Sequence, residues 1–138
     1  MNTPTVAALR GTIKQARSVA ELNPLLPQLH DALARDTDRP LDLAQVIYEA
    51  QVVAGGDFQR LDAATEQIVL GWVWKHWSNE PLALFELLSA ILVNLAGEAA
   101  GQLLEEKLAT EPNPRRQEQL RASIRDRAGD PEEPDPGY

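Results

Sequence analysis

Apolar residues recur at spacings of three and four along nearly the whole chain, and strict alternation between apolar and polar positions is missing. This period is that of a helix with one buried face, whereas a half-buried strand would show alternation. Ala, Leu, Gln, Glu and Arg, which favour helices, are frequent throughout. The pattern therefore predicts an all-α protein.

Prolines, glycines and polar capping residues divide the pattern into about seven helices. We expect them over residues 6–17, 23–35, 40–56, 60–77, 78–97, 98–110 and 113–127. The expected N-terminal caps are Asn23 for the second helix, Asp57 for the fourth and Ser78 or Asn79 for the fifth. Short connections predict antiparallel hairpins within one domain, residues 1–128. Residues 129–138, rich in proline and acids, are expected to form a disordered acidic tail.

An internal repeat is visible when residues 40–57 are superposed on residues 81–98 without a gap. Pro40 aligns with Pro81, Gly56 aligns with Gly97, and the apolar positions between them coincide. The repeat units would be residues 40–77 and 81–110, each a helical hairpin that buries its apolar face against its neighbour. Residues 23–127 thus resemble HEAT-type or armadillo-type α-solenoids, and the resemblance implies a right-handed stack of hairpins. The alternative is an ordinary helical bundle.

Composition limits the function. The net charge of −8 argues against nucleic acid as the main partner, and the absence of cysteine excludes a disulfide framework and thiolate metal sites. No apolar run reaches the roughly twenty residues of a membrane span, and none near the start could serve as a signal-peptide core. We expect a cytoplasmic protein that does not bind membranes.

Catalytic and cofactor motifs are also missing. His30 and His76 lie far apart in the chain, and no serine stands in a G-x-S-x-G elbow. The glycines fit helix ends better than a phosphate-binding loop. The sequence therefore predicts a protein that is not an enzyme and that holds no cofactor or metal.

The features that indicate a binding partner are a tryptophan cluster, a group of acids and one asparagine. Trp72, Trp74 and Trp77 lie on a helix that is apolar almost all round, which is either central in the core or an interface anchored by Trp74 and Trp77. Asn94 interrupts an apolar helix. It is either buried with a hydrogen-bond partner or, as the armadillo resemblance implies, holds an extended peptide. Candidate contacts for a basic partner are Asp36, Asp38, Asp42, Asp57 and Asp62.

The last helix is locally basic, with Arg115, Arg116, Arg121, Arg125 and Arg127 against Glu118 and Asp126. It is either a solvated terminal helix or a basic surface that the acidic tail screens or that holds an acidic partner.

In size, charge and architecture the chain resembles the small helical immunity proteins that bacteria make against toxins. The resemblance implies a non-enzymatic protein whose acidic surface meets a basic toxin domain and blocks it. The alternatives are an adaptor or regulatory subunit of a larger complex, or a homodimer that packs through the tryptophan helix.

Overall fold

The computed structural model describes residues 5–128, so the acidic tail expected at residues 129–138 lies outside the described residues. Within residues 5–128 the chain is helical and has no strand, which confirms the all-α prediction. The elements are α1 (Val6–Gln15), α2 (Val19–Leu22), the 3₁₀ turn η1 (Asn23–Leu25), α3 (Leu26–Arg35), α4 (Pro40–Gly56), α5 (Ala63–His76), α6 (Leu82–Val93), α7 (Glu98–Thr110) and α8 (Pro114–Ala128).

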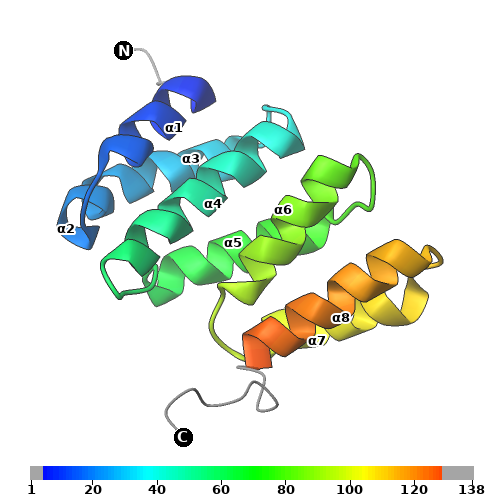
Figure 1. The fold of residues 1–138 in the computed structure, drawn as a ribbon. Helices are drawn as coiled ribbons and strands as arrows, with labels where there is room; N and C mark the ends of the chain where they lie inside the picture. The colour runs from blue at the N-terminus through cyan, green and yellow to red at the C-terminus, as the bar shows by residue number, and fades with distance from the viewer. Residues whose placement is uncertain (1–4, 129–138) are drawn as a thin grey trace, which may run out of the picture.

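The helices lie in two layers (Figure 1). In one layer α4 packs between α1 and α6, and α6 packs in turn against α8. Behind them α3 contacts α5, and α7 lies behind α8. The expected units 40–77 and 81–110 therefore each contribute one helix to the front layer and one to the back layer.

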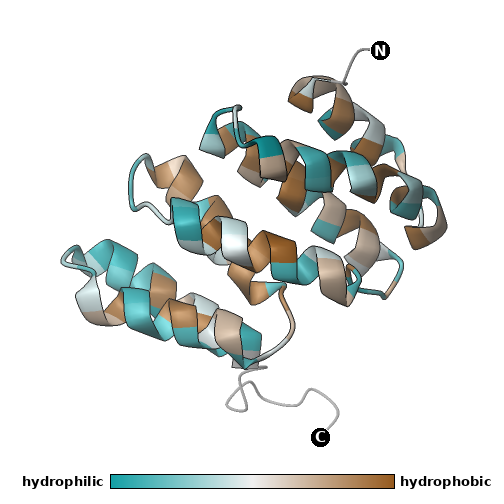
Figure 2. Cartoon of the chain, turned by 180° about the vertical axis from the view of Figure 1, so that it is seen from behind, coloured by the Kyte–Doolittle hydropathy of each residue, from teal (hydrophilic) through white to brown (hydrophobic). Residues whose placement is uncertain are grey.

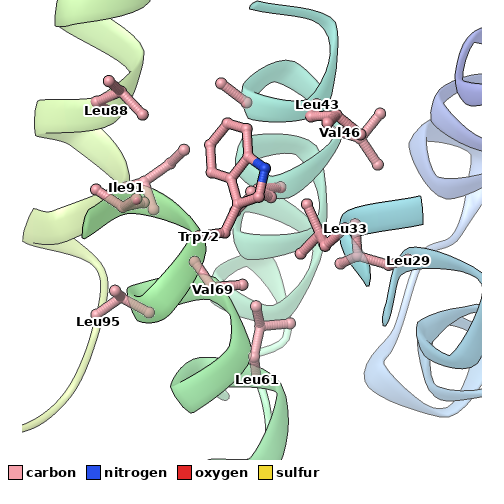
Figure 3. Packing of buried hydrophobic residues seen from close by; sticks show 14 of the residues in the cluster. Leu29, Leu33, Leu43, Val46, Leu61, Val69, Trp72, Leu88, Ile91 and Leu95 are labelled. Atoms are coloured by element: carbon pink, nitrogen blue, oxygen red, sulfur yellow. The ribbon is translucent and has the colours of Figure 1, made fainter. Parts of the chain in front are cut away.

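The core fills the space between the layers. Trp72, only 5% exposed, reaches from α5 among side chains of three other helices, such as Leu33, Leu43 and Ile91 (Figure 3). The loops that join the helices are mostly hydrophilic, whereas hydrophobic residues concentrate on the helices (Figure 2). No helix of the described part of the chain is long and apolar enough to cross a membrane.

The second helical segment begins earlier than the sequence predicts. Ser18 is its cap, because the Ser18 hydroxyl oxygen accepts a hydrogen bond from the Glu21 N–H at 3.2 Å. Glu21 in turn accepts a bond from the Arg17 N–H at 3.0 Å, so the two side chains satisfy backbone donors at the helix start as in a capping box. The predicted cap Asn23 is wrong, since it lies inside the continuous turn of η1.

The expected caps of α5 and α6 are also wrong. Asp62 caps α5, which starts at Ala63 and not at residue 60. Pro81 precedes α6 without any side-chain bond, so neither Ser78 nor Asn79 is its cap. The helix ends at Val93, and Gly97, with a φ of 90°, precedes α7 and does not close α6.

Candidate functional site

The three tryptophans of the cluster occupy different environments. Trp72 belongs to the core, and its indole N–H donates to Asp36 Oδ1 at 3.3 Å. Trp77 is half-buried and packs edge-on against Phe85, with ring centroids 5.7 Å apart. Trp74 is 58% exposed. Of the predicted pair of surface anchors, Trp74 is therefore exposed, whereas Trp77 is partly covered by Phe85 of α6.

Asp36 is held by groups of its own chain. It ends α3 in the left-handed region, with a φ of 53°. Its carboxylate accepts hydrogen bonds from Lys75 Nζ at 2.8 Å and from His76 Nε2 at 2.7 Å, besides the one from Trp72. The Lys75 ammonium is the main reason why the pKa of Asp36 lies below its usual value; partial burial opposes it, and His76 and Trp72 add to it. The carboxylate ties the end of α3 to the end of α5.

Asp57 and Asp62 bind backbone N–H groups at the starts of two helices, near the end of α4 that is opposite to Asp36. Asp57 Oδ2 accepts a hydrogen bond from the Val19 N–H at 3.0 Å, which pins the α4–α5 loop to α2. Asp62 accepts from the Thr65 N–H at 2.8 Å and from the Thr65 hydroxyl at 2.9 Å. The backbone N–H of Thr65 is the main cause that lowers the pKa of Asp62.

Asp38 and Asp42 lie at the start of α4, where they line a pocket between α1 and α4 together with Arg10 and Gln45. Asp42 is paired with Arg39, whose Nε donates at 3.1 Å. At 1.5 Å per residue, α4 places Asp42 about 22 Å from Asp57. The five predicted acids are therefore divided between the two ends of α4, on opposite edges of the stack (Figure 1), and do not form one surface.

Asn94 is neither buried nor inside a helix, so the expectation of a buried asparagine within an apolar helix is wrong. It is the exposed C-terminal cap of α6, and its backbone N–H donates to the last carbonyls of the helix. Its side chain lines a polar pocket with Gln51, Gln59 and Arg60. Gln51 joins α4 to α6, because its Nε2 donates to the Ile91 carbonyl at 3.1 Å.

Phe58 is a functional candidate that the sequence analysis missed. Its side chain is 98% exposed, and its backbone φ of 55° lies in the left-handed region that glycine prefers at a helix end. The loop is nevertheless fixed. The Phe58 and Gln59 N–H groups donate to carbonyls of the last turn of α4 at 3.0 and 2.8 Å, and Asp57 is bound to α2. The sequence feature that could have indicated it is a single phenylalanine in a polar loop after Gly55-Gly56.

Two arginines of the basic helix α8 are structural. Arg116 donates to the Asn79 carbonyl at 2.8 Å and lies over the Phe85 ring at 5.7 Å. Arg127 donates to the carbonyls of Leu92 and Leu95 at 3.2 and 2.8 Å and also to that of Gly97. The remaining arginines of the predicted basic surface are exposed: Arg115, Arg121 and Arg125.

One group of side chains holds the residue types of a catalytic triad but not its order, because the hydroxyl, and not the histidine, lies between the other two groups. His30 Nε2 lies 2.7 Å from the Thr65 hydroxyl, which donates to Asp62. Because the single hydroxyl proton goes to Asp62, His30 must be the donor in its own bond. Thr65 is fully buried, so a substrate could not reach its oxygen. The arrangement is a helix cap with a histidine bound to it, and the described residues contain no group of three metal-ligating side chains.

Comparisons with known proteins assign no family to this arrangement. No family model, no curated protein and no solved structure matches the chain.

Proposed function

We propose that this chain is a non-enzymatic protein-binding module of the cytoplasm that holds its partner at the edge of the stack where the α4–α5 loop carries Phe58. The observation that carries the proposal is the full exposure of Phe58 on a fixed loop. A large apolar ring in water gains free energy when a partner covers it, and aromatic residues are enriched among the strongest contacts of protein interfaces.

The surroundings of Phe58 suit an interface. Because hydrogen bonds already hold the loop, little conformational freedom would be lost on binding. Gln59, Arg60 and Asn94, which line the adjoining pocket, offer hydrogen-bond donors and acceptors around the ring. An apolar centre with a polar rim is the usual composition of such surfaces.

The two-layer order of the helices supports the resemblance to HEAT-type stacks, in which successive hairpins present surfaces to other proteins. The partner that the immunity-protein resemblance implies is a basic toxin domain. Asp38, which has no ionic partner among the described residues, would add long-range attraction to it, whereas Asp42 is already paired with Arg39. An adaptor or regulatory subunit would use the same aromatic contact without this charge dependence.

The test is affinity capture with the tagged chain from extracts of its natural source, quantified by mass spectrometry. The test variant is Phe58→Gly, which removes the ring and suits the left-handed backbone. The control is Leu82→Ala, which removes an exposed apolar side chain at the start of α6, on the opposite edge of the stack. We expect one retained protein to fall at least about 30-fold with Phe58→Gly, the loss expected for a hot-spot residue, and to be unchanged in the control.

Retention that is equal for both variants and the wild-type chain would refute the proposal. Raising the salt concentration from about 0.05 to 0.5 M separates the two partner classes. Exposed charges are then largely screened, so retention of a basic toxin should fall steeply, whereas an apolar contact should persist.

A further inference from the structure

The outer face of α5 is unusual because it is almost free of charge. Its exposed residues are Ala63, Ala64, Gln67, Ile68, Gly71, Trp74 and, as the only ion, Lys75. Lys75 is neutralised by Asp36, with its Nζ 2.8 Å from the carboxylate. In a chain with a net charge of −8, this face can meet a second copy of itself without like-charge repulsion.

A large side chain and a hollow lie on the same stripe of α5. Ala63, Gln67, Leu70 and Trp74 follow one another at helical spacings of four, three and four, so they share one side of the helix. Trp74 projects near the end of this stripe and is 58% exposed. Near its start lies a pocket of about 200 Å³ between α5 and the α6–α7 connection, lined by Ala63, Glu66, Gln67, Leu70, Leu95, Ala96 and Gly97.

We propose that two copies of the chain associate through this face, with α5 antiparallel to α5 and each Trp74 indole seated in the pocket of the other copy. The two-fold axis would run between the two α5 helices, perpendicular to both and level with Gly71. The helices are then antiparallel, and both stripes lie on the same side of the interface. Trp74 lies three residues after Gly71 and Gln67 four residues before it. The indole of one copy is therefore placed over the pocket of the other, and the contact occurs twice.

Gly71 suits the crossing point of the two helices. No atom lies within 4 Å of the position that a Cβ would occupy there, so the space above it is open. Packed helices have axes about 8–10 Å apart and Cα atoms about 2.3 Å from each axis, which leaves roughly 3.4–5.4 Å between facing Cα atoms. A glycine allows that approach. Glu66 in the pocket wall can accept the indole N–H, which needs a partner when it is buried.

The shape and charge of the face favour a second copy over another partner. The face carries a large projecting side chain at the Trp74 end and a pocket at the Ala63 end, so an antiparallel copy is complementary in shape. A parallel copy would place tryptophan against tryptophan. A strongly acidic or basic partner would find little free countercharge, since Lys75 is paired with Asp36 and the carboxylate of Glu66 in the pocket wall accepts the Ala96 N–H at 3.4 Å.

The first test is sedimentation equilibrium over a concentration series. We expect a dimer of the wild-type chain whose dissociation constant rises at least about 30-fold in Trp74→Ala. The exposed position of Trp74 means that this variant should fold, which circular dichroism checks. A wild-type chain that stays monomeric at about 100 μM would overturn the proposal, and so would a dimer that Trp74→Ala leaves unchanged.

The second test uses the absence of cysteine from the chain. Gly71→Cys should form an intermolecular disulfide under mild oxidation, because the two sulfurs would lie at the two-fold axis. Gly11→Cys is the matched control, since Gly11 also lies within a helix and has open space around it, but on α1. Equal cross-linking at both positions would contradict the proposed axis. Phe58→Gly should still dimerise and Trp74→Ala should still retain the protein captured through Phe58, so the failure of one proposal is distinguishable from the failure of the other.

Discussion

Asp36 offers a sharp test of how α3 and α5 are joined, because three substitutions each remove a different part of its role. Asp36→Ala removes the carboxylate but keeps a Cβ in the left-handed conformation at a φ of 53°. Asp36→Gly removes the carboxylate and also the steric strain. Asp36→Asn keeps an acceptor for Trp72 and a residue that tolerates this backbone, and it loses only the charge.

The structure gives the order of the three effects. The Trp72 indole is buried, so its N–H without an acceptor costs about 1–3 kcal/mol. The Lys75 side chain is 68% exposed, so its ion pair contributes only about 0–1 kcal/mol. A non-glycine residue in the left-handed region costs about 1–2 kcal/mol. We therefore expect losses of about 2–4 kcal/mol for Asp36→Ala, about 1 kcal/mol less for the glycine variant, and about 1 kcal/mol for Asp36→Asn.

Urea unfolding followed by circular dichroism measures these differences in the free energy of unfolding. The slope m should be unchanged, because the unfolded surface is the same. The control is Asp31→Ala, which breaks an exposed pair with Arg35 on the same helix and should cost about 0.5 kcal/mol or less. The reasoning would be refuted if Asp36→Ala cost no more than this control, or if the glycine variant were less stable than the alanine variant.

The remaining predictions concern pH, a cap and two glycines. The pKa of Asp36 is lowered in the folded chain, so its stabilisation is complete above the unfolded pKa of about 3.9 and is lost as pH falls through the folded value. The gap in unfolding free energy between the wild-type chain and Asp36→Asn should therefore narrow below about pH 4 in urea titrations. Asp62→Ala should lower the free energy of unfolding by about 1 kcal/mol, because two bonds to Thr65 are lost at the start of α5. Gly11→Ala, in open space within α1, should raise the thermal midpoint, whereas Gly97→Ala should lower it because its φ is 90°.

Helices bounded by local chemistry were predictable from the sequence. Residues 40–56 and 98–110 were expected and observed with the same bounds, because proline opens the first and turn residues flank the second. The start of α5 was misplaced for a reason that local sequence does not contain. Asp57 has the residue type of a cap, but its carboxylate accepts a hydrogen bond from the Val19 N–H of the distant helix α2, and Asp62 caps α5 instead.

The end of α6 shows the same limit. The apolar period continues to Gly97, but the helix stops at Val93, and Arg127 of α8 binds the carbonyl of Leu92 in its last turn and that of Leu95 just beyond it. The apolar period of a helix contains no information about a contact from Arg127, which lies 35 residues after Leu92. The interpretation of Asn94 as a polar residue within a buried helix depended on that misplaced end, and so it failed with it.

The candidate site was predictable only in outline for a related reason. Periodicity places Trp74 and Trp77 on one side of a helix, but whether that side is covered depends on Phe85, which another helix supplies. Chain position likewise grouped five acids that the folded chain distributes over caps, loops and ion pairs. The bond of Asp57 to Val19 is a tertiary contact that chain position does not reveal, whereas Asp62 caps its own helix through the local contact to Thr65.

Most residues of this chain obey the local rules of a stable helical stack, so the positions that break them indicate where stability is not the only requirement. Phe58 holds a bulky ring in water on a backbone suited to glycine. Gly71 weakens a helix interior by about 0.5–1 kcal/mol where an alanine would fit. Trp74 exposes an indole beside that glycine. None of the three improves the isolated fold, whereas each has a physical use once another protein surface covers it, and this is why the binding proposals rest on them and not on the total charge.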